Sequence, residues 1–578
     1  MKNNRKYQSI LQIFLLIAII LLANVAIPPL FNALHLPKRF DLTKEGRFSL
    51  TPATKKMLSE IDDVVYVQVF LEGELPSGFK RLQNEIRWKL DDFRAYTGGY
   101  LEYEFVDPFE NLNGEQRQRA MKQLVEKGLQ PKNLIETAEG YSEKVIFPAA
   151  LVFYKGRELP VMLLQEQLNK GPQETLNNSI ALLEYQIANA IQKIQRKEKP
   201  TLGFLTGHGE LDSKFLESMA VELAQYYFLE RYNVTENLYI PPKFSAIVIA
   251  KPTETFDDKD KFKIDQYVMN GGRVLWLIDN MAANMDSLKN EDGSFLPLAY
   301  DLQLDDLLFK YGARVNFNFV KDLQCADIQL ATGRDPSGNA TQLRPFKWPY
   351  FPIFTYHHPT HPVTKNIDAV LGRFAGSIDT IRTKGANIKK DILLTTSPAS
   401  QIVTTMNRVD VNEVRQKPDF NQYNKGQQAV AVALEGEFPS LFKNRLAKST
   451  IDMIDTLQDV SFREKSLPTK MIVMSDGDII RNGIDARTGR PNPLGYYKYS
   501  QQTFANKELL VNAVEWLTDD NGIIAARSKD VKMRLLDNKK VQNEKTFWQL
   551  LNMLLPIVLV IFAGFVYTFF RKRKYMKG

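Results

Sequence analysis

A run of small and polar residues in the first half of the chain combines residue types that bind ligands. It follows the apolar stretch 201–205 and consists of Thr206, Gly207, His208, Gly209 and Glu210. Glycines let a ligand or a neighbouring backbone approach closely, and the histidine and glutamate add hydrogen-bonding groups. In an open parallel sheet, ligands bind where strands end. We therefore expect either a ligand site or a tight turn that needs glycine at positive φ, and both interpretations stay open.

An acidic motif follows a second apolar run. Asp476 and Asp478 flank one glycine directly after the stretch 470–475. Two carboxylates separated by one residue could hold a hard cation or contact a ligand, and the alternative is an Asx turn that caps the next segment. Together with Glu210 they could instead form the carboxylate pair of a glycan or peptide hydrolase. That chemistry needs the two carboxyl groups about 5 to 10 Å apart across one cleft.

Aromatic residues gather among prolines in the segment 345–356. The segment contains Trp348, Tyr350, Phe351 and Tyr356. Exposed aromatic rings would stack on sugar faces or anchor a partner protein. Burial of the rings in loop packing is the default interpretation, and a partner or glycan surface is the alternative.

Three of the five histidines lie close together, which raises the question of a metal site. His357, His358 and His361 are interrupted by Pro359 and Pro362. Prolines exclude the helical spacing that places two histidines on one metal, and no glutamate lies between them. We predict a loop without a metal ion.

The chain lacks the familiar sequence signatures of catalysis. Cys325 is its only cysteine, so thiol redox pairs, internal disulfides and cysteine-based zinc sites are excluded. It has no G-x-x-x-x-G-K-[ST], G-x-S-x-G or H-E-x-x-H motif. We predict that the protein is not an enzyme, uses no cofactor and is not its own P-loop ATPase.

The chain has an apolar segment near each end, and these two segments decide on which side of a membrane the motifs above lie. An uncharged run covers most of residues 10–31, and a second covers residues 547–570. Each is long enough to cross a bilayer as a helix. Three basic residues lie in the tail 1–9 and five in the tail 571–578. Positive charge favours the cytoplasmic side, so we predict two spans, cytoplasmic termini and a periplasmic body at the inner membrane. A cleaved signal peptide at the N-terminus is the alternative.

The charge of the body argues against nucleic-acid binding. The eight basic residues of the two tails equal the formal net charge of +8, so the body between them is neutral. A nucleic-acid-binding protein would instead carry a basic surface on that body.

The first half of the body predicts a thioredoxin-like α/β domain over residues 40–197. Thr51 can cap a short helix whose first residue is Pro52. The following apolar patterns alternate in the order β-α-β-α-β-β-α and end in a strong amphipathic helix over 174–195. Without a cysteine pair, this domain cannot perform thiol chemistry.

A second and larger α/β domain is predicted over residues 198–520. Strands over 201–205, 245–250, 273–279 and 470–475 alternate with helices, which indicates a mostly parallel, Rossmann-like sheet. Residues 320–465 are less periodic and predict mixed β insertions with long loops. The polar stretch 521–546 predicts a stalk that leads to the second span.

The order of these motifs resembles the GldG family, the gliding-motility-associated ABC-transporter components of Bacteroidetes. The resemblance covers nearly the whole chain and is carried by the segments 40–43, 47–50, 71–76, 205–210, 271–272, 475–478 and 481–482. It implies that the second domain is of the GIFT type, which is shared with an intraflagellar transport protein. It also implies an accessory or substrate-binding subunit that acts with a GldF-type multispan permease and a GldA-type ATPase in gliding motility and the associated secretion.

Several expectations follow for the partners. We expect more than one copy per complex and a possible cell-envelope glycan or peptide as ligand. Two spans are too few to form a transport pore, so a separate permease has to supply it. A periplasmic hydrolase and a structural envelope scaffold are the competing functions.

Overall fold

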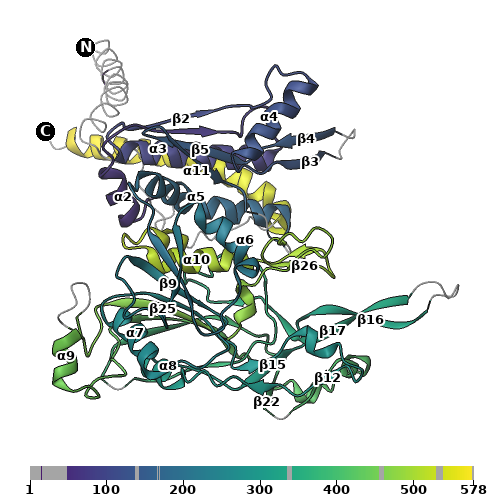
Figure 1. Cartoon of the computed structure of the whole chain (residues 1–578). Helices are drawn as coiled ribbons and strands as arrows, with labels where there is room; N and C mark the ends of the chain where they lie inside the picture. The colour runs from purple at the N-terminus through teal and green to yellow at the C-terminus, as the bar shows by residue number, and fades with distance from the viewer. Residues whose placement is uncertain are drawn as a thin grey trace. The chain divides into compact units, whose positions relative to one another are not determined.

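The computed structural model describes most of the chain between residues 49 and 575. The described residues are 15, 49–136, 142–165, 167, 170–334, 341–383, 385–405, 407–454, 461–528 and 538–575. They fall into two units, Met1–Asp530 and Val531–Gly578. Each unit is described by itself (Figure 1).

The first part of the larger unit is a four-stranded sheet with helices. Its elements are α2 (Pro52–Ser59), β1 (Val65–Val69), α3 (Ser77–Tyr96), β2 (Leu101–Phe105), α4 (Gly114–Glu126), β3 (Lys132–Glu136), β4 (Ser142–Ile146), β5 (Ala149–Tyr154), β6 (Arg157–Met162) and α5 (Pro172–Gln195). Thr51 caps α2, as expected, by accepting a hydrogen bond from Thr54 N. The sheet order is β2-β1-β5-β6, in which β1 and β2 are parallel and the other pairs antiparallel.

This succession matches the predicted order except that the β3–β4 hairpin is inserted between α4 and β5. The thioredoxin-like assignment itself stays a prediction. Helix α5 packs against β5, β6 and α3, and it places leucine and isoleucine side chains in the interior because they recur at helical spacing.

An eight-stranded sheet forms the centre of the second part. Its strands, in spatial order, are β18 (Tyr356–His357), β21 (Ile388–Thr395), β24 (Ala429–Gly436), β25 (Thr469–Met474), β10 (Val274–Leu277), β9 (Phe244–Ala250), β7 (Thr201–Thr206) and β8 (Phe228–Asn233). The five strands from β25 to β8 are parallel, and β24, β21 and β18 add an antiparallel edge. The predicted mostly parallel α/β sheet is confirmed.

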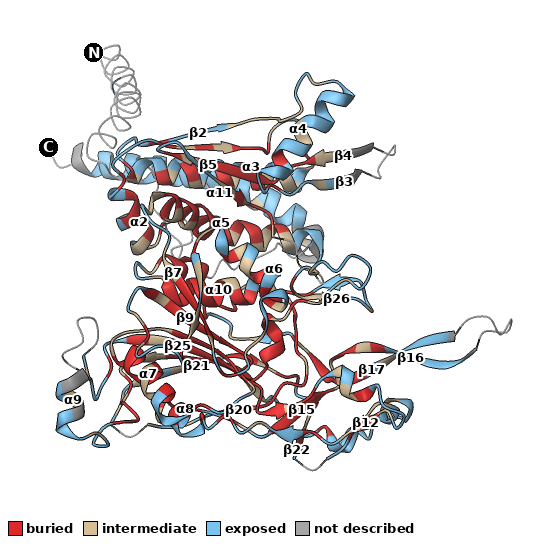
Figure 2. Cartoon of the chain, viewed as in Figure 1, coloured by how far each residue is buried: buried red, intermediate tan, exposed pale blue. Residues whose placement is uncertain are grey.

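Helices cover both faces of this sheet. The side chains of α7 (Asp258–Met269) and α8 (Asp305–Tyr311) join alternate residues of β9, β10, β25 and β24 in one core cluster. Helix α10 (Asn506–Thr518) packs against β9, β10 and β25. Successive side chains of a strand point to opposite faces, so α10 covers the second face. The central strands and the inner sides of these helices are accordingly buried (Figure 2).

The long connection between β10 and β24 contains mixed β structure, as predicted. Its elements are β11 (Met281–Ala282), η1 (Met285–Leu288), β12 (Ser294–Phe295), β13 (Leu298–Ala299), β14 (Ala313–Val315), β15 (Asn318–Asp322), β16 (Cys325–Arg334), β17 (Thr341–Phe354), β19 (Val370–Leu371), β20 (Ile378–Thr380), β22 (Ser400–Thr404), β23 (Val409–Asp410), η2 (Val411–Arg415) and η3 (Phe420–Gln422). They pair as short antiparallel ladders, and β16 with β17 form the longest hairpin (Figure 1).

The remaining short elements of the larger unit are helix α6 (Ser213–Ala224), α9 (Lys448–Ile454), η4 (Gly477–Ile480), β26 (Tyr496–Tyr497), β27 (Gln502–Thr503) and η5 (Ile523–Ser528). The element η5 differs from the predicted stalk over 521–546. Ile523, Ile524 and Arg527 are buried, and η5 packs against α5. The start of that segment is therefore part of the folded body.

The second unit consists of helix α11 (Asn538–Tyr575). Its stretch Asn543–Arg573 is long and apolar enough to cross a membrane, and it is the one such helix among the described residues. It contains the predicted span 547–570. The predicted first span, residues 10–31, lies outside the described residues except for Leu15.

Candidate functional site

Two sequence-predicted motifs lie at the same edge of the parallel sheet. The 206–210 turn follows β7 and the 475–478 motif follows β25, while Lys251 and Asp279 follow β9 and β10. Parallel strands place all four carboxyl ends at one edge, where ligands bind in open α/β sheets. This edge is the candidate functional site.

The two glycines of the 206–210 turn are required by close packing. Gly207 has φ +122° and Gly209 has φ +69°. A Cβ atom on Gly209 would lie 2.2 Å from Oγ1 of Thr253. The backbone N–H groups of Thr253 and Glu254 both donate to the carbonyl of His208, at 2.9 and 3.0 Å. The close approach at Gly209 is therefore made by the protein's own β9–α7 loop, and that at Gly207 by Asn233 and Thr235 at the end of β8.

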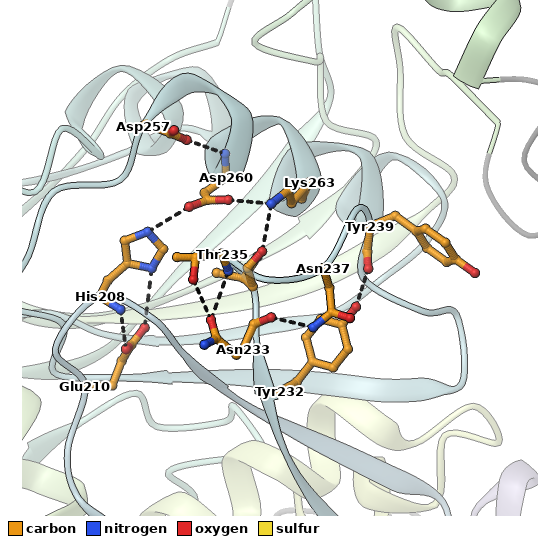
Figure 3. A network of polar contacts seen from close by, with 11 residues as sticks. His208, Glu210, Tyr232, Asn233, Thr235, Asn237, Tyr239, Asp257, Asp260 and Lys263 are labelled. Atoms are coloured by element: carbon orange, nitrogen blue, oxygen red, sulfur yellow. Dashed lines mark hydrogen bonds and ion pairs between the residues drawn. The ribbon is translucent and has the colours of Figure 1, made fainter.

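His208 lies between that loop and helix α7 (Figure 3). Its ring stacks on Phe256 with ring centroids 3.6 Å apart. Nε2 lies 3.1 Å from Oδ2 of Asp260, and because a carboxylate can only accept, Nε2 is the donor. The other oxygen of Asp260 pairs with Lys263 Nζ at 2.7 Å. The imidazole is thus fixed by an aromatic ring on its face and a carboxylate at its edge.

Glu210 folds back onto its own turn. Its Oε2 accepts a hydrogen bond from His208 N at 2.8 Å, and its Oε1 lies 3.8 Å from His208 Nδ1. Neither of these last two atoms has a hydrogen-bond partner among the residues that the structure describes. The side chains of His208 and Glu210 are only 3% and 2% exposed, and burial raises the pKa of Glu210. The tight-turn interpretation accounts for this geometry, while ligand binding at the turn stays a prediction.

A buried lysine organises the neighbouring acidic motif. Lys251 Nζ lies 2.7 Å from Oδ2 of Asp478 and 2.9 Å from Oδ2 of Asp279. Burial alone would raise the pKa of Asp478, but the charges of Lys251, Arg373 and Arg481 outweigh it and hold that pKa below its usual value. Asp478 therefore balances the buried ammonium group as an anion.

Asp476 has a different environment. It is fully buried, and its two oxygens accept hydrogen bonds from Asp478 N at 2.9 Å and from Arg373 N at 2.7 Å. Burial, together with the nearby Asp279 and Asp478, raises its pKa well above the usual value. The Asx turn that the sequence offered as an alternative is present, since Asp476 caps the short helix η4.

These contacts exclude the proposed pair of hydrolytic carboxylates. Glu210, Asp476 and Asp478 are all buried in turns that they themselves stabilise. Two further strands, β9 and β10, separate β7 from β25. Asp478 borders a cavity but is paired with Lys251 at 2.7 Å, and the side chains of Glu210 and Asp476 are buried, so this arrangement does not present two of these carboxylates to one substrate.

Three of the four aromatic residues that could have formed a partner or glycan surface are buried, as the default interpretation expects. Trp348, Tyr350 and Phe351 lie on β17 and are at most 3% exposed. They form a core with Phe319 and Phe374. Tyr356 remains 40% exposed. Side chains of one strand alternate between faces, but both faces of β17 are covered over residues 348–354.

The histidine segment serves packing. His358 Nδ1 accepts from His361 N at 3.0 Å, and the His361 ring lies 5.2 Å from the ring of Trp516. Burial lowers the pKa of His361 to about 4. Within the described part of the chain, no three His, Cys, Asp or Glu side chains are arranged to hold a metal ion.

The sequence interpretation missed three charged residues of this edge. Lys251 and Asp279 each follow an apolar strand directly, so the rule that singled out the 206–210 turn applies to them as well. Asp260 gives no such signal because it lies in the first turn of α7 and meets His208 only through the tertiary fold.

Comparison with known proteins adds independent information. Residues 199–513 match the family described as an ABC-type uncharacterized transport system, and residues 44–153 match a domain of unknown function, DUF7088. An uncharacterized protein of Borreliella burgdorferi is 21% identical over 423 residues, which cover 71% of this chain and 75% of the relative. The solved structure of the mmIFT52 N-terminal domain is 10% identical, with a TM-score of 0.30 over 55% of this chain and 98% of that one.

Proposed function

Because the chain belongs to the family described as an ABC-type uncharacterized transport system, we propose that it is a non-catalytic accessory subunit whose folded body acts outside the cytoplasm. The family match over residues 199–513 is the observation that carries the proposal. It spans the whole parallel sheet and both motifs of the candidate site. Helix α11 supplies a membrane anchor of sufficient length.

The finer assignment concerns partners and process. We propose a multispan permease of the GldF type as the direct partner, a GldA-type ATPase as the energy source, and more than one copy of this chain per complex. Gliding motility and the associated secretion are the proposed process. The absence of a P-loop motif from the sequence supports a separate ATPase.

The domain and ligand assignments are part of the same proposal. We propose a thioredoxin-like domain over 40–197, a GIFT-type domain over 198–520 and a short connection to the span. The two family matches fall within the two domain ranges and support this division. An envelope glycan or peptide is the proposed ligand of the carboxyl edge of the parallel sheet.

Co-purification tests the transporter assignment. The full chain is extracted from its native membrane in mild detergent and captured by a tag on its C-terminal tail, and the captured proteins are identified by mass spectrometry. We expect a multispan permease and an ATPase in comparable amounts. In the matched control, the stretch 547–570 is replaced by an unrelated apolar helix, which should keep the chain in the membrane but lose the permease. Recovery of the chain without any multispan protein would refute the proposal.

Cysteine labelling tests the proposed topology, with the inner membrane between a periplasmic body and cytoplasmic termini. The native Cys325 is 3% exposed, and burial raises the pKa of its thiol to about 12, so it should not react with the label. Glu236→Cys on the exposed turn after β8 should react with an impermeant maleimide in spheroplasts. Lys572→Cys in the C-terminal tail should react only after lysis. Reaction of E236C only after lysis would place the body in the cytoplasm.

A further inference from the structure

A cavity of about 350 Å³ opens beside the acidic motif at the carboxyl edge of the parallel sheet. Its wall comes from distant parts of the chain, namely the start of α6, the β11–η1 segment, β17, the segment after β19, and the loop 481–499. Ligand sites in proteins begin at about this volume, and they favour this edge of an α/β sheet. The cavity is therefore large enough for one small molecule.

Positive charge dominates the wall. Arg373, Arg481 and Lys498 line the cavity, and its two lining carboxylates are Asp478 and Asp286. Both carboxylates already pair with lysines outside the wall. Asp478 lies 2.7 Å from Lys251 Nζ, and Asp286 lies 2.6 Å from Lys289 Nζ. Each lining anion thus already balances a lysine outside the wall, and three lining cations share these two anions.

Each arginine is held by an aromatic ring. The guanidinium of Arg481 lies 4.4 Å from the ring centre of Phe215, and that of Arg373 lies 5.9 Å from the ring centre of Phe351. Arg481 also reaches Asp478 at 3.5 Å. In the described part of the chain, the guanidinium of Arg373 has no carboxylate within 4.0 Å. A stacked guanidinium keeps its N–H donors free at its edge, where they match a carboxylate or a phosphate.

The remaining wall suits a ring. The half-buried side chains of Tyr496 and Tyr499 line the cavity without a hydrogen bond to the described residues, as does the amide of Asn492. Tyrosines present a flat apolar face together with a hydroxyl group that can donate or accept.

We propose that this cavity binds a small molecule in which a carboxylate or phosphate group is joined to a ring, with Arg373 and Arg481 holding the anion and Tyr496 and Tyr499 contacting the ring. This inference goes beyond the accessory role, because the cavity lies within one chain and needs no permease. Failure to bind a ligand and failure to capture a permease are therefore separate results.

Calorimetric titration of the detergent-purified full chain tests the proposal. Phenyl phosphate and benzoate carry both the anion and the ring, inorganic phosphate carries only the anion, and phenol carries only the ring. We expect saturable binding of phenyl phosphate or benzoate at one site per chain, and at least about tenfold weaker binding of inorganic phosphate and of phenol. Whichever of phenyl phosphate and benzoate binds more tightly identifies the anionic group that the cavity prefers. Absence of binding by both, or equally tight binding of phenol, would overturn the proposal.

Variants connect the binding to the cavity. Arg373→Gln and Arg481→Gln should each weaken binding of the preferred probe at least about tenfold, because each removes a charged donor. Arg487→Gln, in the same 481–499 loop but exposed, is the matched control and should bind as the unaltered chain does. If R481Q lowers the unfolding midpoint through its contact with Asp478, binding by R373Q decides, since the Arg373 side chain forms no ion pair with the described residues. Unchanged binding by R373Q would assign the probe to another place.

Discussion

Replacement of Glu515 by glutamine should strongly destabilise the chain, because this carboxylate joins its two sheet-containing parts. Glu515 lies on α10 and accepts hydrogen bonds from three residues of α5, namely Tyr185, Asn189 and Lys193. The side chains of Glu515 and Lys193 are only 8% and 9% exposed. Lys193 also lies 3.6 Å from the ring centre of Tyr226, so its ammonium group cannot move to water without repacking.

The size of the expected stability loss follows from the burial of the ion pair between Glu515 and Lys193. Glu515→Gln keeps the shape and the acceptor but leaves the Lys193 ammonium group buried without an anion. Removing one partner of a buried ion pair costs about 3–5 kcal/mol, a large share of the roughly 5–15 kcal/mol that stabilises a typical protein. The double variant Glu515→Gln, Lys193→Met removes both charges and should recover about 2 kcal/mol or more of the summed single losses. Glu437→Gln is the control, because the Lys465–Glu437 pair is about half exposed and its loss should cost less than about 1 kcal/mol.

The pH dependence has a defined sign. Burial would raise the pKa of Glu515, but the Lys193 charge and the three hydrogen bonds outweigh burial and hold that pKa below its usual value. Its contribution to stability is therefore complete above the unfolded value and is lost as the pH falls through the lower folded value. Urea unfolding of the detergent-purified chain at pH 7 and pH 4 measures both effects. A loss below about 1 kcal/mol for E515Q, or fully additive losses in the double variant, would refute the reasoning.

Three further predictions concern stability and use the same unfolding assay. Gly209→Ala should cost about 2 kcal/mol or more, because residue 209 has φ +69° and the added Cβ would lie 2.2 Å from the Thr253 hydroxyl. Gly489→Ala is the control: φ is +67° there too, but the added Cβ meets no described atom within 4 Å, so it should cost about 1 kcal/mol. Asp478→Asn deprives the buried Lys251 of its nearest anion and should cost about 3 kcal/mol at pH 7, whereas in Asp476→Asn the amide NH2 must face one of two backbone N–H donors, which should cost about 1–3 kcal/mol. Trp348→Ala should cost about 3–5 kcal/mol through the cavity it creates, and a loss below 1 kcal/mol would restore the interpretation of Trp348 as a surface residue.

The sequence predicted the central elements well where the apolar pattern is strong. The predicted strands over 201–205 and 470–475 are β7 (Thr201–Thr206) and β25 (Thr469–Met474). These strands are buried on both faces, so they appear as continuous apolar runs. The edge strand β8 and the hairpin β3–β4 were missed because their polar residues give no comparable pattern.

The candidate site was less predictable, because its chemistry depends on tertiary contacts. The glycines at 207 and 209 correctly indicated a special turn, but nothing near them in the sequence says that the end of β8 fills the space beside Gly207 and the β9–α7 loop that beside Gly209. The same holds for β17, whose three prolines favour a loop. Pairing with β16, with two register shifts, keeps this segment in a hairpin and buries its aromatic rings.

The carboxyl edge of the parallel sheet is thus used in two different ways along its length. After β7, the strand end is closed by its own turn, with His208 and Glu210 buried against α7. After β25, the buried Lys251 balances Asp478, and the segment just beyond it, including Arg481, faces a cavity. Because the parallel strands supply only one side of that cavity, the insertion between β10 and β24 and the loop 481–499 supply most of its wall. Members of the family that share the sheet but differ in these two segments should therefore bind different ligands, or none, without a change in the fold.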